Sequence, residues 1–519
     1  MKLIKIVSDK VQIKTDQFEF HDVRINDLLV VSDGEANLMT VVSSMSDTEA
    51  GLPQMEEDDY ISVPGRIKVL ECSIIGSIKN GKFSKAIDKY PTSDITVKMM
   101  DEEGFKQILS GYESSGFCIG NYAAYHTEAY VDGNKFFQRH SCIVGNTGSG
   151  KSETVAKILE ELSKLSGTNV IVFDIHGEYK KLSYARNIKV GNDFAFPMWM
   201  FGFSGMVLNV LKVKEETATV AMSALRKCYY HLCPDGKENK PVYFNINLML
   251  EMLKRLNEDM VQTGEIYKNG DKAGLPKMVK GDFNGKLSGI INSLEDKKAD
   301  ARYSFLFQDK PQEYLKEIVY QLMSNDRPVK NVDLSDVPHD IAIAIIGAIT
   351  KLVYDIQRTY KNGLVHPITL VCDEAHVYIP NAFQLSASEK RMVEVFEEIA
   401  KEGRKFGISL FVASQRPSEL NKTIMAQCAN FIVSKLNNEN DKSMIKGMIP
   451  DGSESVIDAT TTFNPGEVLI IGDAVPIPLK IQVTLAKERP ESRTIDFWDI
   501  WKESVFFDLN SGIEKYMNS

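Results

Sequence analysis

Residues 145–152 read GNTGSGKS and match the pattern G-x-x-x-x-G-K-[ST] at every fixed position. Glycines let such a loop curl tightly, so that successive backbone N–H groups converge on phosphate oxygens. Lys151 adds a positive charge near the β- and γ-phosphates of a nucleotide, and the Ser152 hydroxyl is suited to ligate Mg²⁺. We therefore expect a nucleoside triphosphate and Mg²⁺ to bind here, and the candidate contacts are Gly145, Asn146, Thr147, Gly148, Ser149, Gly150, Lys151, Ser152 and Glu153.

A pair of carboxylates downstream supplies what hydrolysis of this nucleotide needs. The apolar run at residues 368–372 leads directly into Asp373 and Glu374. At the end of a buried strand, the aspartate reaches the water shell of Mg²⁺ and the adjacent glutamate orients the attacking water. The glutamate in this position favours a RecA-like ATPase over a GTPase or a small-molecule kinase. Gln415, after a further apolar run at 408–412, is the candidate sensor of the γ-phosphate.

The elements that must hold these residues are predicted in the required order. Residues 141–144 are an apolar run typical of a buried strand, and residues 153–165 place apolar side chains on one face of a helix. A second apolar run, 170–173, ends at Asp174, so strand, helix and strand form a unit of a parallel sheet. Asp174 and Glu178 then lie at the sheet edge where ligands bind, with turn and salt-bridge roles as the alternative.

The predicted fold is α/β, with a RecA-like P-loop ATPase core, an N-terminal β-barrel and a helical insertion. Short segments rich in Val and Ile, separated by turn residues, predict the barrel over residues 1–110. The predicted core comprises residues 111–195 and 341–485. Between its halves, residues 196–340 are predicted to be a helical insertion, or alternatively an independent helical domain. Residues 486–519 form a C-terminal tail that could brace the assembly.

Composition and charge exclude several other classes of protein. Hydrophobic residues at 43% and charged residues at 25% are ordinary globular values, which argue against disorder and coiled coils. The net charge of −10 argues against a protein that coats nucleic acid with its whole surface, but it leaves room for a local basic channel. Seven scattered cysteines without a C-x-x-C pair predict reduced thiols in the cytoplasm and no zinc site. No apolar run is long enough for a membrane span, and the N-terminus does not read as a signal peptide.

The chain resembles the HerA family of DNA-translocating ATPases, which are relatives of FtsK. The similarity rests on the strings RHSCIVGNTGSGKS, DIHGEY, LVCDEAH and EGRKFGISLFVASQRPSEL, of which the last is the most specific. The resemblance implies a homo-hexameric ring of RecA-like cores that hydrolyse ATP at subunit interfaces and move double-stranded DNA through a central channel. It also implies a partner: a NurA-like nuclease, or another effector such as the sirtuin-like NAD hydrolases of bacterial anti-phage defence.

Carried over position by position, the resemblance gives most candidate residues a role. It implies that Lys151 binds phosphate and Ser152 binds Mg²⁺. Asp373 would serve the metal and Glu374 the attacking water, and Gln415 would sense the γ-phosphate. For the arginines and the tail, the resemblance has competing interpretations.

Arg404, in the string GRKFG, matches an arginine that family members project into the nucleotide of a neighbouring subunit. Cations at a helix C-terminus also complement the helix dipole without any catalysis, so that interpretation stays open. Arg139 matches a second arginine near the interface, or is a solvated residue beside a strand. Trp498 and Trp501 could clasp an adjacent subunit or pack on their own core.

Two functions fit these observations. The first is an ATP-driven translocase or helicase acting on double-stranded DNA, with a role in DNA processing or phage defence. The second is an ATPase ring that mainly scaffolds and regulates a partner effector, with little DNA translocation. The sequence does not show which loops face a channel, so it leaves both open.

Overall fold

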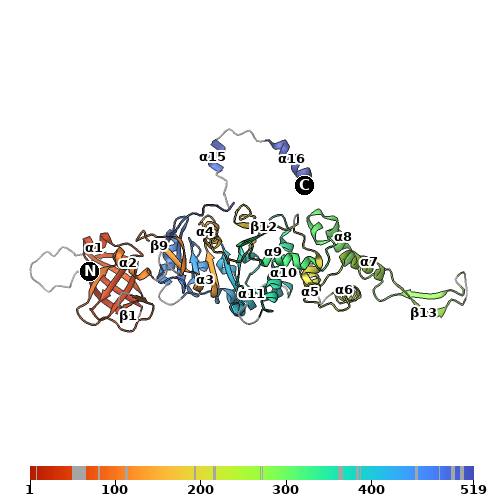
Figure 1. The fold of residues 1–519 in the computed structure, drawn as a ribbon, viewed down its shortest axis with the longest axis horizontal. Coiled ribbons are helices and arrows are strands. Elements are labelled where there is room, and N and C mark those ends of the chain that lie inside the picture. The colour runs from red at the N-terminus through yellow and green to blue at the C-terminus, as the bar shows by residue number, and fades with distance from the viewer. Residues whose placement is uncertain are drawn as a thin grey trace, which may run out of the picture.

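The computed structural model describes residues 1–518 except 8, 50–65, 80–81, 111–114, 192–193, 214–217, 269–270, 272, 361–365, 382–384, 386, 450–453, 479, 492–496 and 503–507. The described chain is elongated (Figure 1). A β-barrel lies at one end, the α/β core is central, and a mostly helical insertion leads to a projecting hairpin at the other end. No helix among the described residues is both long and apolar enough to cross a membrane.

The N-terminal part is a seven-stranded antiparallel sheet that curls until its two end strands meet. Its strand order is β1 (Lys2–Val7), β2 (Lys10–Thr15), β5 (Arg66–Lys79), β4 (Asn37–Glu49), β3 (Leu28–Ser32) and β7 (Thr96–Met99), with β6 (Lys82–Ser84) paired to β5. Alternate residues such as Val11, Ile13 and Leu29 point inward and form a hydrophobic cluster separate from that of the core. The helices α1 (Gln17–Asp22) and α2 (Glu102–Leu109) complete this part. The predicted β-barrel is confirmed.

The core is an eleven-stranded sheet, parallel over the strands that carry the sequence motifs. Its order is β12 (Ala185–Lys189), β15 (Val329–Asp333), β11 (Val170–Asp174), β16 (Ile368–Cys372), β17 (Ile408–Ser414), β10 (Ser141–Val144), β18 (Asn430–Val433), β19 (Glu467–Gly472), β20 (Lys480–Val483), β8 (Gly116–Tyr122) and β9 (Glu128–Asp132). Every residue of β10, β11, β16 and β17 is buried, because helices cover both faces. These helices include α3 (Gly133–Gln138), α4 (Lys151–Ser163), α10 (His339–Gln357) and α11 (Ala387–Glu402). The RecA-like core is confirmed.

The structure corrects the predicted end of the insertion. Residues 329–333, which the prediction assigned to the insertion, form β15, a fully buried strand between β12 and β11. Two polar side chains inside it broke the apolar pattern by which a buried strand is recognised. The Nζ of Lys330 donates to Oδ1 of Asn169 at 2.6 Å, and Asn331 donates to Asp174 at 3.1 Å. Partners distant in sequence therefore satisfy groups that would otherwise be costly to bury.

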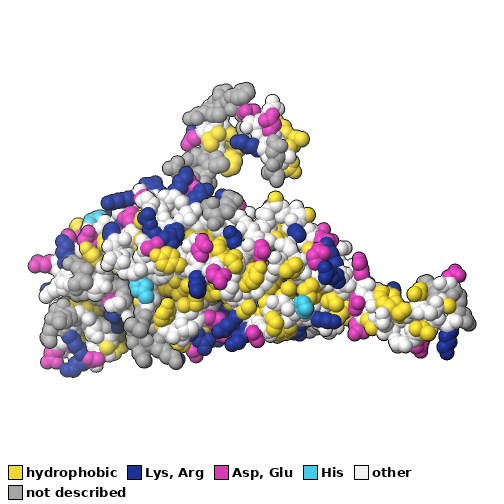
Figure 2. Space-filling view, turned by 45° about the vertical axis from the view of Figure 1, so that its right-hand side comes forward, with side chains coloured by type: hydrophobic (Ala, Val, Ile, Leu, Met, Phe, Trp, Pro, Cys, Tyr) yellow, Lys and Arg dark blue, Asp and Glu magenta, His cyan; other side chains and the backbone are white. Residues whose placement is uncertain are grey.

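The insertion packs on the core and also carries a hairpin. Its elements are η1 (Met198–Phe201), α5 (Gly202–Gly205), the π-helical turn η2 (Met206–Val210), α6 (Thr219–Leu232), α7 (Ile246–Asn257), β13 (Met260–Ile266), β14 (Pro276–Lys280), α8 (Ser288–Ala299), η3 (Ala301–Leu306) and α9 (Tyr314–Met323). Buried residues of these helices and of the ATPase core belong to one hydrophobic cluster, which favours an insertion over an independent domain. The hairpin β13–β14 projects beyond this cluster, and all its residues are exposed (Figures 1 and 2).

The C-terminal tail ends in two helices that stand apart from the core, α15 (Phe497–Lys502) and α16 (Leu509–Asn518) (Figure 1). The side chains of Trp498 and Trp501 are 70% and 72% exposed. The alternative in which these tryptophans pack on the core of their own chain is therefore wrong.

Candidate nucleotide site and the opposite edge of the sheet

The segment 145–150 forms a tight loop between β10 and α4, as its glycines predicted. Gly148 and Gly150 have φ values of 75° and 91°, a left-handed conformation that glycine adopts without strain. Position 145 has no room for a side chain, since a Cβ there would lie 1.7 Å from Oγ of Ser434. The loop is held from behind, because Oγ of Ser149 lies 2.9 Å from Oγ of Ser434 and the N–H of Gly466 donates to the Ser149 carbonyl at 3.0 Å. No sequence motif revealed these two supports.

Lys151 meets both predicted carboxylates inside the core. Its Nζ lies 2.5 Å from Oε1 of Glu374 and 4.0 Å from Oδ1 of Asp373, and all three side chains are buried. Burial raises the pKa of Asp373 to about 7, helped by the neighbouring carboxylates and opposed by the charge of Lys151. Burial opposes ionisation of Glu374, but the charge and hydrogen bond of Lys151, the hydrogen bond of Gln415 and the nearby His376 together lower the pKa of Glu374.

Gln415 connects Glu374, the candidate for orienting the attacking water, to the phosphate loop. Its Nε2 donates to Oε1 of Glu374 at 2.5 Å, while its Oε1 accepts a hydrogen bond from the Thr147 hydroxyl. Glu374 itself has a left-handed backbone, with φ 46°, which costs energy in a non-glycine residue and is typical of functional sites. His376 lies on its other side, with Nδ1 3.4 Å from Oε2 of Glu374 and 3.2 Å from Oγ of Ser414. The predicted sensor and the glutamate are therefore in direct contact.

The string DIHGEY forms a turn under the same site. Both carboxylate oxygens of Asp174 accept backbone hydrogen bonds, from the N–H groups of Glu178 at 3.0 Å and Tyr179 at 2.9 Å. This geometry favours the turn role for Asp174, whose pKa is raised by burial. The turn buries the Tyr179 side chain completely, and its hydroxyl has no hydrogen-bond partner within the described part of the chain.

The donor set suits a nucleotide with a divalent cation. Ser152 and Asp373 offer a hydroxyl and a carboxylate, which are oxygen ligands that Mg²⁺ prefers. Within the described part of the chain, Oε2 of Glu153 and Oε2 of Glu178 are buried without a hydrogen-bond partner. Buried oxygens of this kind favour a bound cation or its water ligands. The residues that the sequence assigned to Mg²⁺ thus fit it.

Arg404 lies at the opposite edge of the sheet. It belongs to the short helix η6 (Gly403–Phe406), which precedes β17, whereas Gln415 follows that strand. The 7 residues of β17 span about 23 Å, so Arg404 does not reach the phosphate loop of its own chain. Its side chain is exposed on a cavity of about 950 Å³, and within the described residues no carboxylate lies within 4.0 Å of its guanidinium.

Arg139 lies on the same edge, directly before β10. Its Nη1 forms an exposed ion pair with Oδ2 of Asp473 at 2.7 Å. Like Arg404, it is separated from the nucleotide site of its own chain by the length of a strand.

His140 fixes the position of this edge, a role that the sequence did not reveal. Its Nδ1 accepts the N–H of Leu410 at 2.9 Å, and its Nε2 lies 3.0 Å from the Ala400 carbonyl of α11. Burial lowers the pKa of His140 to about 4, helped by the charge of the nearby Arg404 and opposed by the hydrogen bond to the Ala400 carbonyl. A neutral imidazole therefore joins α11 to β17 beside η6.

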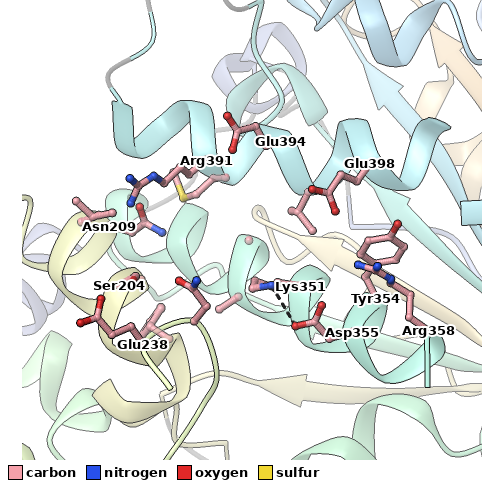
Figure 3. A pocket seen from close by; sticks show the side chains of 18 of the residues that line it. Ser204, Asn209, Glu238, Lys351, Tyr354, Asp355, Arg358, Arg391, Glu394 and Glu398 are labelled. Carbon is pink, nitrogen blue, oxygen red and sulfur yellow. Dashed lines mark hydrogen bonds and ion pairs between the residues drawn. The ribbon is translucent and has the colours of Figure 1, made fainter. Parts of the chain in front are cut away.

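A separate cavity of about 700 Å³ lies between the insertion, α10 and α11 (Figure 3). Lys351 and Asp355 of α10 form an ion pair at 3.1 Å on one wall, and Arg391 and Glu394 of α11 line another. The α11 residues that line the cavity lie between Arg391 and Glu398, and this helix leads directly into η6.

The phosphate loop, the buried acidic pair and the RecA-like sheet together define a P-loop ATPase, and the protein is an ATP-hydrolysing enzyme. Residues 117–353 match the family model "Helicase HerA, central domain". This part of the chain is therefore similar to the central domain of the HerA helicases, as the resemblance implied.

Curated relatives are similar in sequence, and a solved structure is similar in fold. The chain is 27% identical to a probable helicase of Methanocaldococcus jannaschii, over 87% of this chain and 82% of the relative. It is 26% identical to the DNA double-strand break repair helicase HerA of Saccharolobus solfataricus, over 80% of this chain and 77% of the relative. In fold it is similar to VirB4 of Thermoanaerobacter pseudethanolicus, with a TM-score of 0.50 and 16% identity over 72% of this chain and 97% of that one.

Proposed function

We propose that the protein is a HerA-type translocase or helicase of double-stranded DNA that works as a homo-hexameric ring. The observation that carries this proposal is the division of the ATPase residues between two edges of one sheet. Lys151, Asp373 and Glu374 meet at one edge, and Arg404 is exposed at the other. A single chain therefore holds two complementary halves of a site that join only between subunits.

In the proposed mechanism, Lys151 and the N–H groups of the loop bind the β- and γ-phosphates of ATP. Ser152 and Asp373 would hold Mg²⁺, which when bound neutralises phosphate charge and orients the γ-phosphate. Glu374 orients the attacking water and accepts its proton, and its lowered pKa keeps it ionised for this role. Gln415, in contact with both Thr147 and Glu374, links the γ-phosphate to the position of that carboxylate.

Arg404 of one subunit would complete the site of its neighbour by stabilising charge that develops on the γ-phosphate. Arginines of this kind increase turnover by about 10³–10⁵-fold. Arg139, on the same edge, would contact the same nucleotide. Because each site then needs a head-to-tail neighbour, the contact is heterologous and generates a ring if it closes.

The proposed substrate of the ring is the backbone of double-stranded DNA. Two relatives are named DNA double-strand break repair helicases, which supports DNA as the substrate of this chain. We propose a cytoplasmic protein that acts with a NurA-like nuclease or another effector, such as a sirtuin-like NAD hydrolase, in DNA processing or phage defence.

The test is the ATPase rate of the purified ring with and without duplex DNA, at rising salt. Binding through phosphates predicts stimulation by DNA of any sequence and a steep loss of affinity as salt rises. Strongly sequence-specific binding would contradict the proposal. An assembled ring that hydrolyses ATP but binds no duplex would instead support a scaffold that regulates its effector.

A further inference from the structure

Three cations gather where the barrel meets the core. A cavity of about 380 Å³ at this junction is lined by Phe83, Lys85, Lys135, Gln138, Arg139 and Asp473. Phe83 and Lys85 come from the barrel, on and directly after β6. Lys135 and Gln138 lie in α3, Arg139 directly follows that helix, and Asp473 follows β19. The lining therefore carries three positive charges and one negative charge.

Carboxylates offset part of this positive charge, and the ammonium group of Lys85 is bound by a backbone carbonyl instead. Nζ of Lys85 donates to the Gly472 carbonyl at 2.6 Å, and desolvation of its ammonium group lowers its pKa. Lys135 lies on the rim, with Nζ 3.7 Å from Oδ2 of Asp132. Within this lining, Asp473 is the one carboxylate, and its Oδ2 lies 2.7 Å from Arg139.

The Arg139–Asp473 pair is open to exchange with another anion. The two side chains are 57% and 45% exposed, and exposed ion pairs contribute little stability. A phosphate group carries more charge than a carboxylate and accepts hydrogen bonds from an arginine fork and from lysines at once. The carboxylate of Asp473 thus occupies an anion position beside Arg139 that would bind a phosphate more strongly.

The position of the cavity indicates where such a phosphate comes from. Gln138 lines both this cavity and the larger one that Arg404 lines, so the two cavities border the same side chain. The strands that follow Arg139 and Arg404, β10 and β17, are direct neighbours in the sheet. The three cations therefore extend the edge that is turned away from the phosphate loop of its own chain.

We propose that Lys85 and Lys135, together with Arg139, bind a phosphate group of the nucleotide held by the neighbouring subunit, and that Asp473 competes with this phosphate for Arg139. This inference rests on the proposed function, since it requires a neighbour at this edge. Lys85 belongs to the barrel, so the barrel supplies a cation to the ATPase site. Barrel position and nucleotide occupancy are then coupled through the carbonyl of Gly472 and the side chain of Asp473.

Two substitutions with opposite expected effects test the proposal, measured as the KM for ATP of the assembled ring without DNA. Lys85→Met removes a charged contact to phosphate, so KM rises on the order of tenfold. Asp473→Asn removes the competing anion while keeping size, so KM falls several-fold. Lys85→Arg keeps the charge and restores KM. The matched control is Lys89→Met, an exposed barrel lysine 4.0 Å from Glu35, which leaves KM unchanged.

A purely structural role for Lys85 and Asp473 predicts different effects of the two substitutions. If this junction only holds the barrel in place, Lys85→Met and Asp473→Asn both lower the melting temperature and both raise KM, which overturns the proposal. If Lys85→Met leaves KM unchanged and instead reduces the salt dependence of DNA binding, the ligand is DNA and the proposal is also wrong. Arg404→Ala distinguishes failure of the proposed function from failure of this inference. A fully active Arg404→Ala ring refutes the site shared between subunits. If the Arg404→Ala ring is inactive but Lys85→Met has the wild-type KM, only this inference is wrong.

Discussion

Replacing Arg404 by alanine should abolish ATP hydrolysis by the assembled ring while leaving nucleotide binding intact. The length of β17, about 23 Å, keeps Arg404 away from the phosphate loop of its own chain, so its loss does not disturb that pocket. The expected fall in turnover is about 10³–10⁵-fold, as for other arginines that complete a site in trans. Nucleotide binding by the isolated subunit should stay within about twofold, because its phosphate ligands are all retained.

Mixing two inactive proteins isolates the shared site. In Arg404→Ala the residues Lys151 and Glu374 are intact, and in Glu374→Gln the arginine is intact. When equal amounts exchange subunits, about one interface in four joins an intact pocket to an intact arginine, for a heterologous ring. The mixture should therefore recover up to about a quarter of wild-type ATPase activity, measured as phosphate release.

The control is Lys405→Ala, which removes a neighbouring exposed cation from the same short helix. If Arg404 only complements the dipole of α11, both substitutions cost about 0.3–1 kcal/mol of stability and leave hydrolysis intact. Normal hydrolysis by an assembled Arg404→Ala ring would refute the shared site.

Three further outcomes follow from the geometry of the site. Glu374→Gln should bind ATP but hydrolyse it very slowly, whereas Lys151→Ala should weaken binding itself; a Glu374→Gln ring with most of its ATPase rate would refute the assigned role. Gly145→Ala should lose nucleotide binding, since its Cβ would lie 1.7 Å from Oγ of Ser434, and Gly145→Ala combined with Ser434→Gly should recover part of it in a nucleotide titration. Stability should fall at acid pH through His140, whose folded pKa of about 4 lies below its usual value. The unfolded chain then binds the extra proton, so the free energy of unfolding drops by about 2 kcal/mol between pH 7 and pH 5. Asparagine tolerates the left-handed backbone at this position (φ 55°), so His140→Asn removes the titrating group without backbone strain. Urea titrations of this variant at pH 7 and pH 5 should lack the drop of about 2 kcal/mol in the free energy of unfolding. A pH dependence equal to that of the wild type would contradict the role of His140.

The parts of the fold that the sequence predicted are those in which local pattern and burial agree. The strands β10, β11, β16 and β17 are uninterrupted or nearly uninterrupted apolar runs, and each leads into a polar segment at the carboxyl edge. Strand polarity alone then brings Lys151, Glu374 and Gln415 together, because parallel strands end at the same edge. The site could therefore be assembled from the sequence without a structure.

The missed features depend on partners that are distant in the chain. β15 was not predicted, because burial of its polar residues Lys330 and Asn331 depends on hydrogen bonds to Asn169 and Asp174. Both partners are distant in sequence. The supports of the phosphate loop, Ser434 and Gly466, carry no motif, since any small residue and any free N–H in that place would serve. His140 was missed for a similar reason, because a buried histidine between two backbone groups leaves no periodic signal.

ATP-driven movement along duplex DNA is the central claim, and displacement of a third strand from a DNA triplex measures it directly. The assembled wild-type ring, with ATP and Mg²⁺, should release the third strand at a rate that follows its ATPase activity. Glu374→Gln should bind the same duplex without releasing that strand. A wild-type ring that binds duplex and hydrolyses ATP, yet displaces the third strand no faster than Glu374→Gln, would contradict the account.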